Sequence, residues 1–110
     1  MTHSLRFLPE VADDALAAFA WYEAKAQGLG EQFLRAFYAA ANQVPRNPML
    51  HTKAHGDFRR CLLPRFPYAF YFTVEGEEVV GFGLFHCARD PETVRAQLRR
   101  RHPAAGNERR

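Results

Sequence analysis

The 110-residue sequence has few of the residues on which covalent catalysis and disulfide frameworks depend. Its one serine, Ser4, stands near the N-terminus and outside any glycine-flanked nucleophile turn. Its two cysteines, Cys61 and Cys87, are too few for a disulfide scaffold and favour a reducing compartment. No apolar run approaches the ~18 residues of a membrane span, and no charged segment followed by a long apolar stretch opens the chain. We therefore expect a cytoplasmic protein with no membrane contact.

Motifs for metals and nucleotides are also missing. No CxxC or HExxH spacing relates His51, His55, Cys61, His86 and Cys87, so we expect no metal site. We interpret the two cysteines as buried, inert strand residues. No glycine-rich loop followed by Lys-Ser or Lys-Thr is present, which argues against a nucleotide hydrolase. The sequence predicts no cofactor.

Apolar and aromatic residues, in contrast, make up 47% and 14% of the chain. A chain of this length and composition forms one domain with a real core. We place that domain at residues 1–102 and expect residues 103–110 to be a flexible basic tail. Positive charge is clustered, with five basic residues against one acidic in 46–65 and seven against three in 89–110. Such clusters attract phosphates or an acidic partner segment, or are solvated surface.

The spacing of apolar residues predicts an α+β fold that begins with a strand and two helices. A short N-terminal strand over 3–8 precedes an amphipathic helix over 9–26, whose start is favoured by Asp13 and Asp14 through the helix dipole. Gly28 and Gly30 separate it from a second helix with its apolar face over 33–44. So short a connection makes the two helices an antiparallel hairpin.

The second half predicts a small antiparallel β-sheet and a last helix. A polar, histidine-bearing stretch over 47–57 is interpreted as a loop. Three strands follow over 58–63, 66–74 and 78–85, with a tight turn between the last two. A basic C-terminal helix begins after Asp90, which is expected to cap it. The helical hairpin is expected to pack on the sheet.

The middle strand is apolar on both sides. Tyr68, Phe70 and Phe72 point one way, while Tyr71 points the other. Both faces of the sheet must therefore be covered. The helical hairpin covers one face, and either the C-terminal helix or a second protein covers the other.

Arginines and one histidine are the main candidates for chemistry. They lie on the first strand of the sheet, in the turn after it and at the end of the last strand: Arg59, Arg60, Arg65, His86 and Arg89. Arginine suits bidentate contact with phosphate, and histidine transfers protons near neutral pH. Either these residues form a phosphate-gripping or phosphodiester-cleaving site, or the arginines pair with Asp57, Asp90 and Glu92 and have a structural role.

Several segments, in their order and spacing, resemble the RelE/ParE superfamily of toxins from bacterial type II toxin–antitoxin systems. The resemblance covers about residues 3–101 and rests on Trp21-Tyr22-Glu23, Gly28-Leu29-Gly30-Glu31-Gln32-Phe33, Phe58-Arg59-Arg60-Cys61-Leu62, Phe66-Pro67-Tyr68-Ala69-Phe70-Tyr71 and His86-Cys87-Ala88-Arg89-Asp90-Pro91. It implies a small α+β toxin domain with a cognate antitoxin chain wrapped around it.

The superfamily divides into RelE-like ribosome-dependent endoribonucleases and ParE-like poisons of DNA gyrase. Arg59 and Arg89 match two positions of the nuclease pattern, whereas Cys61, Tyr68 and Arg95 stand where other nuclease residues are expected. The closing His-x-x-Arg-Asp-Pro segment is more typical of ParE-like proteins. The resemblance therefore favours a ParE-like toxin aimed at gyrase.

Two alternatives remain open beside that interpretation. The first is an mRNA endoribonuclease acting on the ribosome, with Arg59, His86 and Arg89 as its catalytic residues. The second is a toxin-derived scaffold that binds its partner and poisons nothing. In each case an acidic, apolar antitoxin segment is expected on Arg60, Tyr68, Phe70, Tyr71 and Phe72. Operator DNA would be reached only through the antitoxin.

Overall fold

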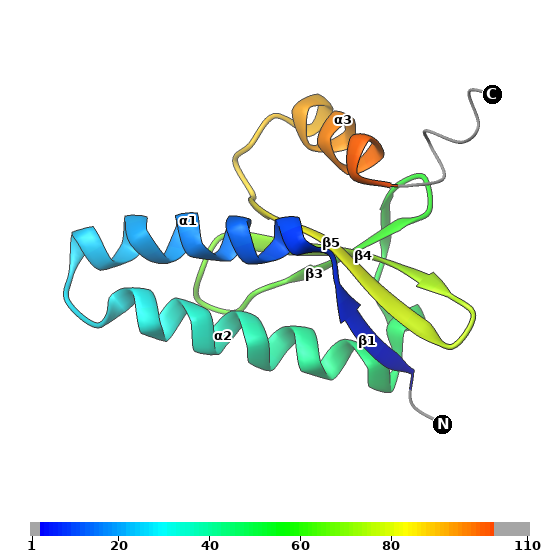
Figure 1. Cartoon of the computed structure of the whole chain (residues 1–110), viewed down its shortest axis with the longest axis horizontal. Coiled ribbons are helices and arrows are strands. Elements are labelled where there is room, and N and C mark those ends of the chain that lie inside the picture. The colour runs from blue at the N-terminus through cyan, green and yellow to red at the C-terminus, as the bar shows by residue number, and fades with distance from the viewer. Residues whose placement is uncertain (1–2, 103–110) are drawn as a thin grey trace.

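A computed structural model describes residues 3–102, which form three layers (Figure 1). A helical hairpin lies on one face of a five-stranded sheet, and the last helix lies on the other face. The predicted α+β class is confirmed. The elements in chain order are β1 (Ser4–Phe7), α1 (Pro9–Lys25), α2 (Leu29–Gln43), the 3₁₀ turns η1 (Val44–Arg46) and η2 (Pro48–Leu50), β2 (Lys53–His55), β3 (Phe58–Leu62), β4 (Tyr68–Glu75), β5 (Glu78–His86) and α3 (Pro91–Arg101).

The strand order in the sheet is β1-β5-β4-β3-β2. All neighbouring pairs are antiparallel except β1 and β5, which run parallel from Ser4 opposite Glu78 to Phe7 opposite Gly81. β1 and β2 are therefore the two edges. β1 is shorter than β5, so it leaves the last part of the outer edge of β5 unpaired by a strand.

The predicted loop over 47–57 is wrong in part, because it contains η2 and the edge strand β2. Lys53 pairs with Arg59 and His55 with Phe58 across a turn in which Gly56 has a φ of +55°. A polar edge strand of three residues carries no apolar alternation, so its pattern cannot be told from that of a loop.

The main core lies between the hairpin and the sheet. Phe33 and Phe37 of α2 and Phe70 and Phe72 of β4 have no exposed surface there. Phe37 and Phe70 meet edge to face, with ring centroids 5.6 Å apart. Burying a phenylalanine contributes about 1.5–3 kcal/mol, so this cluster fixes the hairpin against the sheet.

A second apolar cluster lies between α3 and the other face of the sheet, so the C-terminal helix covers that face. Val94 and Leu98 of α3 are buried against Phe58, Tyr71 and other sheet residues. The side chain of Asp90 accepts hydrogen bonds from the backbone and hydroxyl of Thr93, which confirms the predicted cap of this helix. Within the described residues, α3 closes a compact layer over this cluster.

The connection between α1 and α2 is held by a carboxylate. Gly28 adopts the left-handed conformation, with a φ of +87°, which favours glycine. The backbone N–H groups of Gly28 and Gly30 each donate to an oxygen of Glu23 at 2.9 Å. Glu23 thereby satisfies unpaired donors at the start of α2 and adds a charge that the helix dipole favours.

Among residues 3–102, no helix is long and apolar enough to cross a membrane.

Candidate functional site

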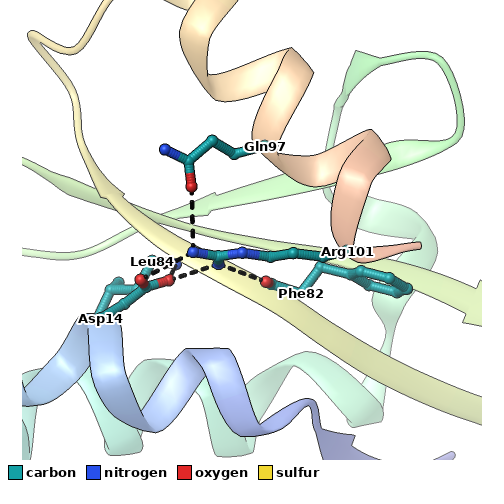
Figure 2. A network of polar contacts seen from close by, with 5 residues as sticks. All are labelled: Asp14, Phe82, Leu84, Gln97 and Arg101. Atoms are coloured by element: carbon teal, nitrogen blue, oxygen red, sulfur yellow. Dashed lines mark hydrogen bonds and ion pairs between the residues drawn. The ribbon is translucent and has the colours of Figure 1, made fainter. Parts of the chain in front are cut away.

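An ion pair joins α1 to α3 across the outer edge of β5 (Figure 2). Arg101 of α3 donates to both carboxylate oxygens of Asp14, at 2.8 and 3.1 Å. The same two side chains bind the strand where β1 no longer pairs with it. The N–H of Leu84 donates to Asp14 at 3.0 Å, and Arg101 donates to the carbonyl of Phe82 at 2.9 Å. Asp14 and Arg101 thus cap an open strand edge.

The edge groove lies beside this ion pair, between α1 and the end of β5. It has a volume of about 380 Å³ and is lined by Asp14, Ala17, Ala18, Trp21, Tyr68, Leu84, His86 and Arg89. The indole of Trp21 is 55% exposed although it is among the largest apolar side chains of the protein. A groove with small alanines on its wall and an aromatic ring at its rim suits an apolar segment of a partner.

The turn from β5 into α3 holds His86 and Arg89. The backbone N–H of Ala88 donates to Nδ1 of His86 at 2.9 Å, so in the neutral ring Nε2 carries the proton. The imidazole also meets the ring of Tyr68 edge to face at 5.2 Å. The Arg89 guanidinium lies 5.4 Å from the ring of Phe85. Both residues line the edge groove and a second cavity on the sheet face that carries α3.

We call this second cavity the basic pocket. Its volume is about 290 Å³, and it is lined by Lys53, Ala54, His55, Arg60, Tyr71, His86, Cys87, Arg89, Pro91 and Val94. Three of these ten residues carry a permanent positive charge and none is acidic. The sequence grouped five residues into one candidate site. The structure brings Arg60, His86 and Arg89 together here, whereas Arg59 and Arg65 do not line this pocket. The sequence did not predict Lys53 or His55, because β2 was interpreted as loop.

Arg59 lies elsewhere. Neighbouring strand residues face opposite sides of a sheet, and Arg59 pairs with Phe72 while Arg60 pairs with Tyr71. Arg59 therefore lies on the side of the helical hairpin, where it donates to the carbonyl of His51 at 2.7 Å. It lines a separate cavity of about 260 Å³. Of the three residues expected to act in an endoribonuclease, only His86 and Arg89 share a site.

The residues expected to meet an antitoxin also separate into two groups. Phe70 and Phe72 have no exposed surface and Tyr71 only 6%, because the chain's own helices cover them. Arg60 is exposed and Tyr68 is partly exposed. Of these five residues, Arg60 and Tyr68 therefore have the surface that a partner could contact in this conformation.

The cysteines differ from each other. Cys61 is buried as expected, and burial raises the pKa of its thiol. Cys87 is exposed, so the interpretation of both as buried strand residues is wrong for Cys87, which follows the end of β5 in the turn. Within residues 3–102, no group of three or more His, Cys, Asp or Glu side chains is placed to hold a metal ion.

The lowered pKa values of two histidines, one just before β2 and one in it, allow a prediction of how the free energy of unfolding depends on pH. Burial lowers the pKa of both His51 and His55 below 6.5, with smaller contributions from Arg59 at His51 and from Arg95 and Arg60 at His55. As the pH falls below about 6.5, the unfolded chain binds more protons at these rings than the folded chain does, so the free energy of unfolding should rise with pH in this range. This contribution is complete above about pH 6.5 and is lost as the pH falls through the lowered pKa.

Urea unfolding at several values between pH 5.5 and about 7.5 measures this slope while most carboxylates stay ionised. A double variant, His51→Gln with His55→Gln, is expected to have a shallower slope. An identical slope in the double variant would show that other groups govern the pH dependence.

The fold and site define a class of protein: a small α+β domain in which a hairpin and a C-terminal helix enclose a mostly antiparallel sheet, with two cavities meeting at the β5–α3 turn. No family model and no curated protein sequence matches the chain. A solved structure, the chromosomal ParDE TA system from P. aeruginosa, matches with a TM-score of 0.67 and 18% identity. The match covers 77% of this chain and 96% of that chain, and it shows that the two chains share a fold, as the resemblance implied.

Proposed function

We propose that this protein is the toxin of a type II toxin–antitoxin pair, that it poisons DNA gyrase, and that a cognate antitoxin neutralises it. The observation that carries the proposal is the likeness to a chain of a ParDE system over 96% of that chain's length. A likeness so complete leaves little of the neighbour's chain outside the shared fold. The closing His86-Cys87-Ala88-Arg89-Asp90-Pro91 segment, typical of ParE-like proteins, forms the turn where the two cavities meet.

The edge groove supports an antitoxin partner. Apolar surface at Trp21, Ala17 and Tyr68 lies next to the positive charge of Arg89. A segment that alternates apolar and acidic residues would bury its apolar side chains there and pair its carboxylates with Arg89. Arg60 lies on the far side of the β5–α3 turn, within reach of a segment that continues over it.

The endoribonuclease alternative is favoured by one observation, the meeting of Arg60, His86 and Arg89 in the basic pocket. Cleavage by a 2′-hydroxyl needs proton transfer and charge stabilisation at one phosphate. Arg59 lies on the opposite face of the sheet and cannot join the other two there. Fewer residues of the nuclease pattern therefore share one site in the structure than the sequence suggested. This favours the gyrase proposal.

Induction of the chain alone in a growing bacterium tests the function. We expect growth arrest with accumulation of gyrase-cleaved DNA and intact mRNA, and the same arrest for His86→Ala, because a gyrase poison needs no proton transfer at that ring. Ribosome-dependent mRNA cuts that disappear in His86→Ala or Arg89→Ala would overturn the proposal in favour of the nuclease. Absence of arrest from a well-expressed, folded chain would leave the scaffold alternative.

A further inference from the structure

A third cavity, which we call the mixed-charge pocket, lies toward the β2 edge of the sheet, away from the edge groove at β5. Its walls come from η2, the β2–β3 hairpin, β4 and the end of α3, which lies beside that hairpin (Figure 1). Its volume is about 260 Å³, and it is lined by Met49, Lys53, Asp57, Arg59, Thr73, Val74, Glu75 and His102. Besides the histidine, two basic and two acidic side chains line it, so their charges balance. The proposed function assigns no role to this pocket.

Arg59 is a partly buried cation without an anion. Its guanidinium donates to the carbonyl of His51, and no carboxylate of residues 3–102 forms an ion pair with it. Burial lowers the pKa of the His51 imidazole, and the Arg59 charge lowers it further. Lys53, in register with Arg59 on the neighbouring strand, approaches Asp57 at 3.6 Å, but that carboxylate is 93% exposed. A guanidinium that has lost part of its water is stabilised most by an anionic acceptor, so this wall suits the anionic group of a ligand.

The carboxylate of Glu75 supplies the acceptor side of the pocket. Its Oε2 atom accepts a hydrogen bond from the Thr73 hydroxyl at 2.9 Å and lies 3.8 Å from Nε2 of His102. Thr73 is only 4% exposed, so a fixed hydroxyl orients the carboxylate. Within the described part of the chain, the Oε1 atom of Glu75 accepts no hydrogen bond. This oxygen can therefore accept from an N–H group of a ligand.

A pocket with balanced charges selects against ligands that carry several charges of one sign. The two acidic side chains repel a polyanion, and the two basic ones repel a polycation. Arg59 instead suits a single carboxylate, and Glu75 suits a nitrogen donor close to it. Met49, which is 57% exposed, and Val74 add apolar surface for a side chain. The volume of about 260 Å³ restricts the bound group to a small one.

We propose that the mixed-charge pocket binds an apolar α-amino acid or the C-terminal residue of a peptide. Both have the same chemistry, an α-carboxylate next to a nitrogen donor and an apolar side chain. The carboxylate binds the Arg59 guanidinium, the nitrogen donates to Glu75, and the side chain packs on Met49. This binding needs neither gyrase nor an antitoxin, so its test does not depend on the proposed function.

Titrations of the purified full chain, followed by NMR of its backbone amides, test the proposal with three probes. L-leucine carries the carboxylate and an ammonium group, N-acetyl-L-leucine carries the carboxylate next to an amide as a C-terminal residue does, and L-leucinamide lacks the carboxylate. We expect shifts at Thr73 and Glu75 with a dissociation constant of about 1 mM for L-leucine or N-acetyl-L-leucine, and binding of L-leucinamide weaker by about ten-fold or more.

The three affinities distinguish the two sources of the ligand. Tighter binding of L-leucine identifies a free amino acid, tighter binding of N-acetyl-L-leucine identifies a peptide C-terminus, and equal affinities for these two support a site that accepts both. Equal binding of L-leucinamide would overturn the proposal, because the carboxylate would then contribute nothing. Absence of binding by both carboxylates up to about 20 mM would overturn it as well.

Met49→Glu and Leu50→Glu are a matched pair of variants. The two residues are adjacent in η2 and 57% and 76% exposed, but only Met49 lines the pocket. Met49→Glu brings a negative charge near the ligand's carboxylate and should weaken binding about five-fold or more, whereas Leu50→Glu should change it less than about two-fold. Both positions are exposed, so thermal melting should stay within about 2 °C of the unaltered chain and confirms that the variants are folded. Equal weakening by the two variants would overturn the proposal.

Arg59→Gln tests the anion contact directly. Without the guanidinium, N-acetyl-L-leucine should lose most of its advantage over L-leucinamide, which is a change in selectivity that a general loss of stability does not produce. Retention of the full preference for the carboxylate in Arg59→Gln would show that another group binds it and would overturn the proposal.

Discussion

Replacement of Asp14 by alanine is expected to lower the free energy of unfolding by about 3 kcal/mol, as measured by urea unfolding. The Asp14 and Arg101 side chains are only 15% and 14% exposed, so the pair is largely screened from water. Without the carboxylate, Arg101 keeps the carbonyl of Phe82 and the side chain of Gln97 but has no opposite charge. The N–H of Leu84 loses its acceptor at the same time. An uncompensated charge and an unpaired backbone donor both destabilise the fold.

Asp13→Ala is the matched control, because Asp13 precedes Asp14 on α1, has the same charge and is exposed. Its replacement should change the free energy of unfolding by no more than about 0.5 kcal/mol. Asp14→Asn keeps an oxygen for Leu84 while removing the charge, and an intermediate loss of about 1–2 kcal/mol is expected. Equal effects of Asp13→Ala and Asp14→Ala would contradict this account and restore the helix dipole as the role of both residues.

The sequence predicted most elements of the fold for reasons that are local. Helix α3 begins directly after Asp90, which caps it, and the proline that follows Asp90 occupies its first turn. Strand β4 is buried on both faces because aromatic residues occupy both of them. Its pairing with β5 follows from the tight turn at Gly76, which has a φ of +65°. Local signals of this kind can be recognised in a single sequence because each depends on only a few neighbouring residues.

The groups that build the site come from distant parts of the chain, and they escaped prediction for that reason. Asp14 and Arg101 are 87 residues apart, and each had a sufficient local explanation, as a dipole partner and as part of a charged run. Lys53 belongs to a strand that the polar pattern concealed. The one available signal was the two-residue period of a strand. That period places Arg59 and Arg60 on opposite faces and would have kept Arg59 out of the pocket.

Replacement of Gly30 by alanine is expected to lower the free energy of unfolding by about 3 kcal/mol, against the usual preference of a helix for alanine. A Cβ atom at this position of α2 would lie 2.7 Å from the backbone oxygen of Phe19 and 2.6 Å from its ring. The oxygen belongs to α1 and cannot rotate away, so the two helices must separate. Separation would loosen the contact of Tyr22 with Phe33, whose rings now stack at 5.3 Å.

Two further variants separate this steric effect from other consequences of losing a glycine. Gly28→Ala meets nothing within 4 Å and strains only the left-handed backbone, so it should cost about 1 kcal/mol. Gly30→Ala made in a Phe19→Ala background removes the ring but leaves the carbonyl, so most of the loss should persist relative to Phe19→Ala alone. Full recovery in that background would show that the aromatic ring alone sets the distance between α1 and α2. Persistence would show that backbone contact sets it and that glycine is required at position 30 of the hairpin.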